Sequence, residues 1–433
     1  MHKVFIVLTL AMLTVLRGQS LDGFLEERGR RLWDTTGSVV LKSFPGALGW
    51  SAADFTQMRY AAGSARQKLT FAGIPLPEVI FYYNDKPADK LSRKLVSLQV
   101  SVYNRGDCGH WDKKRFQEAL TAVERRLWEL TRDRNPSKSR RFLGQARIEQ
   151  ITWRASGYDV SLRWSGRGDE NEYITLLFAE RGSTGKLGEE IRASLNRSEL
   201  RERKIKERDG TIRLEIPPVT QGGKGYCVGA TLERVLKYFG SEVDQHIIAQ
   251  IAESDARLGT SIDVALQALK NAGRKLNVRI QDVYVDDSFA SLLGLNNLFK
   301  KYNRQARLQG LPEVDSTLRP RGGVIDLSDQ LTRLDPSVFI ASRQKRDRDA
   351  KWFMQEIRNN IDRSYPLCWT LIMFPQDTQQ GRFSFHARII NGYNLKNNTI
   401  IYTDTWGPES TPKTMPLDEA WAKTTHLILV APR

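Results

Sequence analysis

Residues 219–240 read VTQGGKGYCVGATLERVLKYFG, a glycine-rich loop followed by a helical pattern. Leu232 is followed by apolar residues three, four and seven positions later, which line one face of a helix, and Gly240 is a natural stop. The pattern places Cys227 at the start of this helix. There the unpaired backbone N–H groups and the helix dipole favour negative charge, so they stabilise a thiolate over a thiol. The segment therefore predicts a nucleophilic cysteine.

A glutamine upstream of this cysteine has the position of an oxyanion donor. Gln221 lies six residues before Cys227, and the intervening glycines let the chain fold back so that the amide lies beside the sulfur. Together with the backbone N–H of Cys227, the amide would donate to the oxyanion of a tetrahedral intermediate. The same residues also fit a loop glutamine before a helical core cysteine. This segment alone leaves both interpretations open.

A second segment changes that balance. Residues 382–407 read RFSFHARIINGYNLKNNTIIYTDTWG, a pattern typical of a β-hairpin that turns at residues 395–398. The hairpin would bring His386 and Asp404 to the same end. The imidazole would take up the thiol proton and later protonate the leaving amine, while the carboxylate holds the ring tautomer and supports its charged form. A lone histidine on a strand is more often a buried structural residue, but the four residues together predict a catalytic site.

These segments resemble the papain-like peptidases related to the double-glycine-leader (bacteriocin-processing) peptidases. The resemblance covers roughly residues 215–430. Two of its motifs come early: Gln221 with Tyr226-Cys227 opening a helix, and Gly259-Thr260-Ser261 before a helix at 263–271. The later two are the Pro366 strand after a helix around 352–361, and the hairpin from His386 to Tyr393 with Asp404 and Trp406. The family's nucleophile falls on Cys227, its oxyanion glutamine on Gln221, its histidine on His386 and its aspartate on Asp404. The resemblance implies a papain-like fold, with the cysteine helix packed on an antiparallel sheet that bears the histidine and aspartate.

This sequence departs from the family at three positions beside the site. The family often has glycine after the cysteine, glycine before the histidine and proline after the aspartate, where this chain has Val228, Phe385 and Thr405. The chemistry needs none of the three, so the differences bear on how substrate reaches the site. Transporter-type members carry membrane spans and an ATPase module. This chain shows no P-loop pattern, which argues against an exporter role.

The length of 433 residues favours about two or three folding units. Strand-like runs of β-branched and aromatic residues occur at 79–83, 95–103, 158–164 and 173–178, and apolar residues recur at helical spacing from Asp112, a plausible N-cap, to Thr131. These elements predict an α+β accessory domain over residues 21–208. Residues 21 to about 75 should hold only short helices and loops, and residues 21–208 resemble no family.

The boundary between the two domains is expected at a turn. Residues 186–208 are rich in charge with few apolar anchors, which predicts an exposed connecting helix, and Asp209-Gly210 ends it. The papain-like domain then spans residues 209–433.

Residues 1–20 have the pattern of a signal peptide. A short basic start precedes an apolar run, and the small residues Gly18 and Ser20 are spaced as before a cleavage site. An uncleaved anchor is the alternative. No later stretch approaches about 18 apolar residues, so no further membrane span is expected. The chain is therefore predicted to be secreted or periplasmic.

Cysteine count and net charge bound the other possibilities. Three cysteines leave at least one free thiol; Cys368 lies in a predicted buried strand, and Cys108 is either a free loop thiol or its disulfide partner. The 66 Lys and Arg residues exceed the 50 Asp and Glu residues by 16, which favours anionic partners such as cell-surface polymers. The basic runs at 132–147, 201–208 and 343–351 are mostly interleaved with acids and lack interleaved aromatics, so we interpret them as solvated faces and expect no nucleic-acid binding.

The sequence therefore predicts a cysteine peptidase that hydrolyses a peptide or isopeptide bond. No cofactor is required, and His110, His246 and His426 lack the spacing of a metal site. Three alternatives remain open: a transglutaminase-like acyl transferase with the same order of residues, a non-catalytic papain-fold binding module, and an anion-binding surface protein.

Overall fold

The computed structural model describes most of the chain from Gln19 to Arg433. The described ranges exclude residues 1–18, 51–56, 64, 66, 85–86, 144–145, 168–169, 182–194, 220, 222–224, 242, 253, 255–261, 290, 319–327, 344–346, 379–380, 382 and 407–410. Most of the predicted signal peptide and the Gly259-Thr260-Ser261 motif therefore lie outside the described residues.

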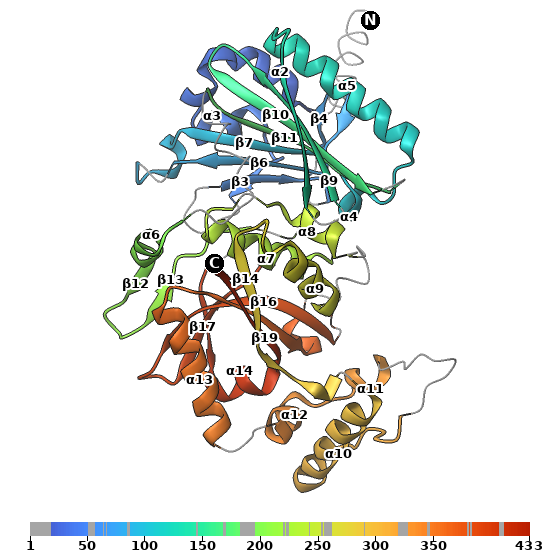
Figure 1. Ribbon diagram of the computed structural model, residues 1–433, viewed down its shortest axis with the longest axis vertical. Helices are drawn as coiled ribbons and strands as arrows, with labels where there is room; N and C mark the ends of the chain where they lie inside the picture. Colours follow the sequence, from blue (N-terminus) through green and yellow to red (C-terminus); the bar gives the residue numbers. More distant parts are fainter. Residues whose placement is uncertain are drawn as a thin grey trace, which may run out of the picture.

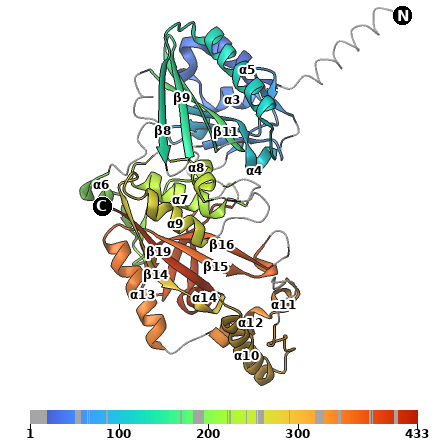
Figure 2. The same ribbon diagram turned by 45° about the vertical axis from the view of Figure 1, so that its right-hand side comes forward.

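The architecture is mixed α+β, as the sequence predicted, and is built on two large antiparallel sheets. Figure 1 shows the N-terminal sheet in the upper half of the molecule and the C-terminal sheet in the lower half, and Figure 2 shows the same division from a second direction. No helix in the described part of the chain is both long and apolar enough to cross a membrane.

The N-terminal sheet has eight strands in the spatial order β2 (Gly49–Trp50), β3 (Gln57–Ala61), β6 (Glu78–Tyr83), β7 (Leu95–Asn104), β11 (Glu170–Glu180), β10 (Tyr158–Arg167), β9 (Ala146–Arg154), β8 (Ser137–Leu143). Helix α5 (Lys113–Thr131) packs against β9 and β11 and buries its apolar stripe in the same core. Asp112 is its N-cap and accepts a hydrogen bond from the backbone N–H of Arg115 at 2.7 Å. The four predicted strands and this helix are confirmed.

The prediction that residues 21–75 hold only short helices and loops was wrong in part. Helices α2 (Leu21–Arg28) and α3 (Gly37–Ser43) are present, but β3 is an internal strand of the large sheet. A further small sheet joins β1 (Gln19–Ser20), β4 (Leu69–Phe71) and β5 (Ile74–Pro75). Strands of two to five residues are too short to give a clear alternating pattern, so the sequence did not reveal them.

The C-terminal sheet follows the order β12 (Lys204–Lys206), β13 (Ile212–Leu214), β16 (Ser384–Asn394), β15 (Leu367–Met373), β19 (Thr424–Pro432), β14 (Val278–Val285), with β17 (Thr399–Thr403) and β18 (Lys413–Pro416) continuing from β16. The predicted boundary needs correction, because Asp209-Gly210 is the turn of the β12–β13 hairpin inside this sheet. The described part of the predicted connecting helix contains only α6 (Arg197–Glu202) before β12. Strand β12 has only one apolar residue, an isoleucine between two lysines, so the sequence of this charged segment did not indicate a strand.

Both faces of the C-terminal sheet are covered by helices. Helices α7 (Cys227–Tyr238), α8 (Gln245–Ile251) and α9 (Ile262–Ala272) lie on the side toward the N-terminal half, and α13 (Asp347–Asp362) and α14 (Leu417–Lys423) lie on the other side (Figure 1). Every residue of β15 is buried, as expected for a strand covered on both faces. The site described below forms where α7 packs on β16.

A helical insertion between β14 and α13 was not predicted. It contains α10 (Leu292–Gln309), α11 (Ser328–Thr332) and α12 (Pro336–Arg343), which form a small apolar core with Ile372 and Phe374. Arg343 is largely buried and lies 2.5 Å from the Asp286 carboxylate. The interpretation of the run that begins at Arg343 as a solvated face was therefore wrong at this residue.

Candidate active site

The predicted nucleophile lies at the first residue of α7. Cys227 is partly exposed, and the preceding Tyr226 is fully buried. The backbone carbonyl of Tyr226 accepts the first hydrogen bond of the helix from the Ala230 N–H at 2.8 Å. Burial alone would raise the pKa of Cys227. The hydrogen bond and charge of His386 and the backbone N–H groups of Ala387 and Val228 outweigh burial, so the pKa lies below its ordinary value. The thiolate is therefore more accessible here than at an ordinary cysteine.

The predicted base lies on β16, beside this helix. His386 is 1% exposed, and its Nε2 lies 2.7 Å from Asp404 Oδ1. Burial would lower the pKa of His386, but its hydrogen bonds to Asp404 and Cys227 raise it above its ordinary value. Since Asp404 engages Nε2, Nδ1 is the ring atom left for the sulfur. The structure thus brings together a thiol and an imidazole encoded 159 positions apart.

The carboxylate behind the histidine makes four hydrogen bonds. Asp404 Oδ1 accepts from His386 and from the backbone N–H groups of Thr405 at 2.7 Å and Trp406 at 3.1 Å, while Oδ2 accepts from Arg388 Nε at 2.7 Å. Burial would raise the pKa of Asp404, but His386, Arg388 and the Trp406 N–H together hold it well below its ordinary value. A buried, ionised carboxylate is therefore available to orient the imidazole and to support its positive form.

An indole ring covers the histidine. Trp406 stacks on His386 with ring centroids 3.8 Å apart and an interplanar angle of 22°. The stack restrains rotation of the imidazole and keeps water from its face. In the sequence, Trp406 stood out only as part of the family resemblance.

Gln221 is held by two hydrogen bonds to one residue. Its backbone N–H donates to the Thr405 carbonyl at 3.1 Å, and the Thr405 hydroxyl donates to Gln221 Oε1 at 2.8 Å. The side chain is 5% exposed. Because the hydroxyl donates to the oxygen end of the amide, this contact fixes the orientation of the Gln221 side chain. Thr405 is one of the departures from the family, and a proline could not make the side-chain contact.

A buried arginine that the sequence analysis missed ties the site segments together. Arg234 on α7 is fully buried and donates to the Asp404 carbonyl at 2.6 Å, to Thr403 Oγ1 at 2.8 Å and to the Pro217 carbonyl at 2.9 Å. It therefore joins the nucleophile helix to the end of β17 and to the chain leading to Gln221. Burial, partly offset by Asp404, lowers the pKa of Arg234 to about 10. Its spacing of seven from Cys227, two helical turns, was the available signal.

The other two cysteines belong to other elements, Cys108 to α4 (Arg105–Cys108) and Cys368 to β15. None of the three cysteines forms a disulfide, so of the two alternatives for Cys108 the pairing with Cys368 is wrong. Cys368 is buried in β15, and burial raises the pKa of its thiol to about 12. The pKa of Cys227 is lowered where that of Cys368 is raised, because Cys227 has a histidine partner.

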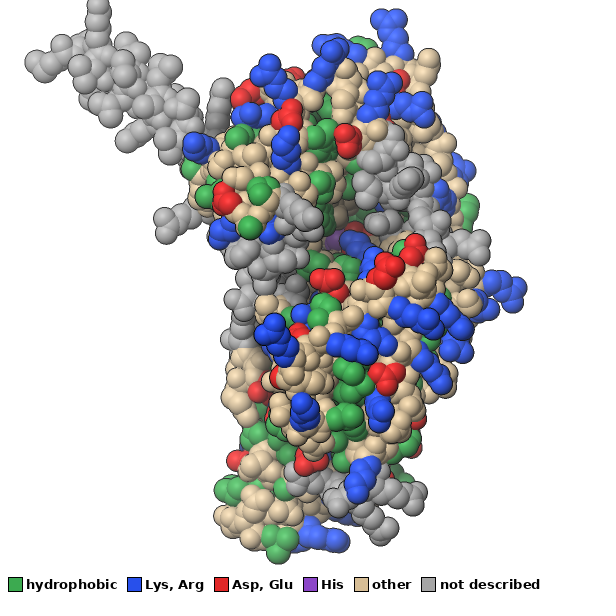
Figure 3. Space-filling view, turned by 90° about the vertical axis from the view of Figure 1, so that its left-hand side faces the viewer, with side chains coloured by type: hydrophobic (Ala, Val, Ile, Leu, Met, Phe, Trp, Pro, Cys, Tyr) green, Lys and Arg blue, Asp and Glu red, His purple; other side chains and the backbone are tan. Residues whose placement is uncertain are grey.

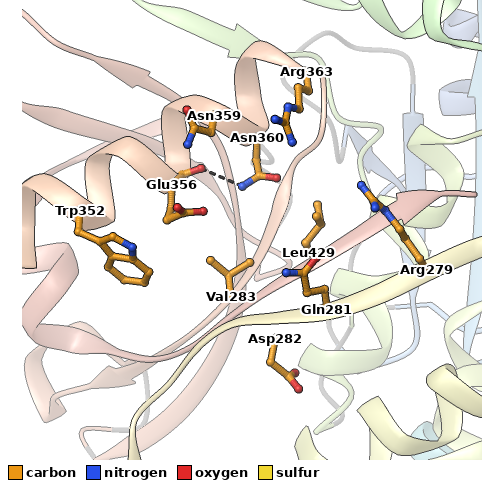
Figure 4. Close-up of a pocket in the computed structure, with 10 residues that line it drawn as sticks. All are labelled: Arg279, Gln281, Asp282, Val283, Trp352, Glu356, Asn359, Asn360, Arg363 and Leu429. Atoms are coloured by element: carbon orange, nitrogen blue, oxygen red, sulfur yellow. Dashed lines mark hydrogen bonds between the residues drawn. The ribbon is translucent and has the colours of Figure 1, made fainter.

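A pocket that none of these site residues lines lies elsewhere in the C-terminal half. A pocket of about 480 Å³ opens between β14 and α13 (Figure 4). Its lining residues are Arg279, Gln281, Asp282, Val283, Trp352, Glu356, Asn359, Asn360, Arg363 and Leu429. None of these side chains is a thiol, hydroxyl or imidazole. The chemistry therefore points to the Cys227 site. Figure 3 shows one face of the molecule, with the surface hollowed between the upper and lower halves.

Within the residues that the structure describes, no three or more histidine, cysteine or acidic side chains are grouped so that they could hold a metal ion. Comparisons of the chain with protein-family models, with curated proteins and with solved structures found no significant match. The geometry of the site is therefore the basis on which a function can be inferred.

Proposed function

We propose that this protein is an exported cysteine peptidase with a papain-like C-terminal domain, in which Cys227, His386 and Asp404 form the triad and Gln221 contributes to the oxyanion hole. One observation carries the proposal: His386 is hydrogen-bonded both to the carboxylate of Asp404 and to a cysteine at a helix N-terminus. The packing of α7 on the sheet bearing β16 supports the papain-like assignment.

The reaction begins with attack of the Cys227 thiolate on the carbonyl carbon of a peptide or isopeptide bond. The oxyanion that forms accepts hydrogen bonds from the Gln221 amide and the Cys227 backbone N–H. The His386 imidazolium then gives its proton to the nitrogen of the breaking C–N bond, and the amine leaves. A thioester to Cys227 remains.

Hydrolysis of the thioester reverses the roles. Neutral His386 takes a proton from water, whose oxygen attacks the thioester carbonyl, and the C–S bond breaks to release the acid and the thiolate. Asp404 remains ionised throughout and stabilises the imidazolium each time it forms. If an amine took the place of water, the same thioester would make the protein a transglutaminase-like acyl transferase.

A thiol-directed probe tests the proposal directly. At neutral pH, we expect iodoacetamide to label Cys227 faster than Cys108, and His386→Ala to abolish this preference, because the imidazole stabilises the thiolate. Incubation with a peptide library, read by mass spectrometry, should show cleavage that Cys227→Ala abolishes and that Cys108→Ala leaves intact. Product masses show whether water or an added amine accepts the acyl group.

Equal labelling of Cys227 and Cys108, unaffected by His386→Ala, would contradict catalysis and favour a non-catalytic binding module.

A further inference from the structure

A buried hydrogen bond joins the N-terminal sheet to the residue before the nucleophile. The Tyr226 hydroxyl donates to Glu172 Oε1 at 3.0 Å, and the two residues are 0% and 2% exposed. Glu172 belongs to β11, a strand of the N-terminal sheet, whereas Tyr226 caps α7 at Cys227. Burial, with the Glu172 charge, raises the pKa of Tyr226 far above its ordinary value, so the phenol stays protonated and remains a donor.

The same carboxylate is held by a cation from the N-terminal half. Arg105, the first residue of α4 (Arg105–Cys108), places Nε 3.0 Å from Glu172 Oε2. Its Nη2 also donates to the carbonyl of Ser254 at 3.1 Å, just beyond α8. One guanidinium therefore connects the carboxylate to a second segment of the C-terminal half.

Packing around this group makes the contact part of the protein core. The Tyr226 and Tyr173 rings lie 6.0 Å and 6.1 Å from the ring of His246 on α8. Tyr173 and Ile148 belong to the N-terminal sheet, yet they are buried in the same apolar cluster as α7. The Tyr226 side chain is thus enclosed by both halves of the chain.

We propose that Glu172 and Arg105 are positioning residues for Cys227, so that the N-terminal half completes the active site of the peptidase instead of being a detachable accessory. The inference rests on the proposed function. The carboxylate fixes the phenol of Tyr226, the phenol fixes the backbone at the start of α7, and the backbone sets the distance from the sulfur to His386. A shift of about 1 Å at a reacting group can cost about 10²-fold in rate.

Two conservative variants test the positioning role in the full chain, with Cys108→Ser as the parent so that Cys227 is the reporter thiol. Tyr226→Phe removes the hydroxyl alone. We expect it to lower the rate of iodoacetamide alkylation at neutral pH, and kcat where a substrate is known, by about 10-fold to 100-fold with little change in KM. Glu172→Gln keeps an oxygen that accepts from Tyr226, so it should fall between the parent and Tyr226→Phe.

Tyr238→Phe is the matched control. Tyr238 lies at the other end of α7 and donates its buried hydroxyl to the Ser364 carbonyl at 3.1 Å, a contact within the C-terminal half. Its loss should lower the melting temperature about as much as Tyr226→Phe but leave alkylation within about twofold of the parent. A drop in reactivity confined to Tyr226→Phe therefore reports on positioning and not on general loosening.

The two proposals fail in different ways. If the parent reacts rapidly and Tyr226→Phe reacts as fast at every pH, the positioning role is overturned and the peptidase proposal stands. If Cys227 of the parent reacts no faster than an unfolded thiol, the proposed function falls, and this inference falls with it.

Discussion

At the scale of the residue, the site is a row of ionisable groups in which the pKa values of Cys227 and Asp404 are lowered and that of His386 is raised. His386 and Arg388 both contact the carboxylate of Asp404, one at each oxygen. Arg388 also lies over the Tyr402 ring, with 4.7 Å between its guanidinium and the ring centroid. Two donors on one carboxylate fix its rotation, and rotation of the carboxylate would move the imidazole. Arg388 is therefore a positioning residue for the histidine.

The pH dependence of activity should follow from Cys227 and His386. The pKa of Cys227 is lowered and that of His386 is raised, and both shifts favour the thiolate–imidazolium pair over the neutral pair. Activity should rise with pH as the thiolate forms and fall at higher pH as the imidazolium loses its proton. Asp404→Asn removes the charge that raises the pKa of His386, so the alkaline limb of kcat/KM should move to lower pH.

The same profile measured on Asp377→Asn provides the control. Asp377 forms a partly exposed ion pair with Lys423 and lies outside the triad. Its substitution should leave both limbs in place. An alkaline limb that stays unchanged in Asp404→Asn would show that Asp404 does not set the charge of His386.

At the scale of the element, the site depends on contacts between two segments: the one that precedes α7 and the one that follows β17. The segment before α7 reaches Thr405 through Gln221, and Arg234 fastens α7 to Pro217 and to the end of β17. Gly392 of β16 lets the β13 strand come close, because a Cβ at that position would lie 2.4 Å from the Ile212 carbonyl. Strand β13 leads directly into the loop that carries Gln221.

Removing either side of the Gln221–Thr405 contact should affect turnover more than thiol reactivity. Gln221→Ala deletes the proposed oxyanion donor and should lower kcat about 10²-fold to 10³-fold. Thr405→Val keeps the amide but frees its oxygen end, so a smaller loss of about tenfold is expected. Alkylation of Cys227 by iodoacetamide, which forms no oxyanion, should remain within about twofold of the parent in both variants. Loss of alkylation together with turnover would instead show a general collapse of the site.

The elements differ in how far the sequence could predict them. Helix α5, helix α7 and the β16–β17 hairpin have long periodic patterns and were found from those patterns. Strand β3 is too short, and the strand β12 is hidden among charges. Helix α10 buries apolar residues at helical spacing, so the sequence pattern could have predicted it; these residues are Leu295, Leu298, Phe299, Tyr302 and Ala306.

Within the site, the sequence indicated residue types but not their contacts. Cys227, His386, Asp404 and Gln221 were found because their chemistry and spacing fit a known site. The contacts of Arg234 and Arg388 with Asp404 depend on side-chain directions in packed elements, which spacing alone does not specify. The contact of Tyr226 with Glu172 joins the start of α7 to a strand of the N-terminal sheet, and no local pattern links them.

At the scale of the whole molecule, the N-terminal sheet contributes side chains to the apolar core of the C-terminal half. Leu143, Ile148 and Tyr173 of the N-terminal sheet are buried in the apolar cluster built mainly from the C-terminal half. Ser165 of β10 also donates to Gln250 of α8 at 2.5 Å. An interface of this kind couples the unfolding of one half to that of the other.

The chain should therefore unfold in one cooperative step, and Ile148→Ala tests this coupling. Ile148 and Ile151 both lie on β9 and are 6% and 5% exposed, but Ile148 packs in the C-terminal core and Ile151 in the N-terminal core. Each alanine substitution should cost about 2–5 kcal/mol of unfolding free energy. Hydrogen exchange followed by mass spectrometry in urea should show peptides from both halves losing protection together in either variant. If Ile148→Ala weakened only the C-terminal peptides and Ile151→Ala only the N-terminal peptides, the halves would be independent units, and the dependence of Cys227 on the N-terminal sheet would lose its physical basis.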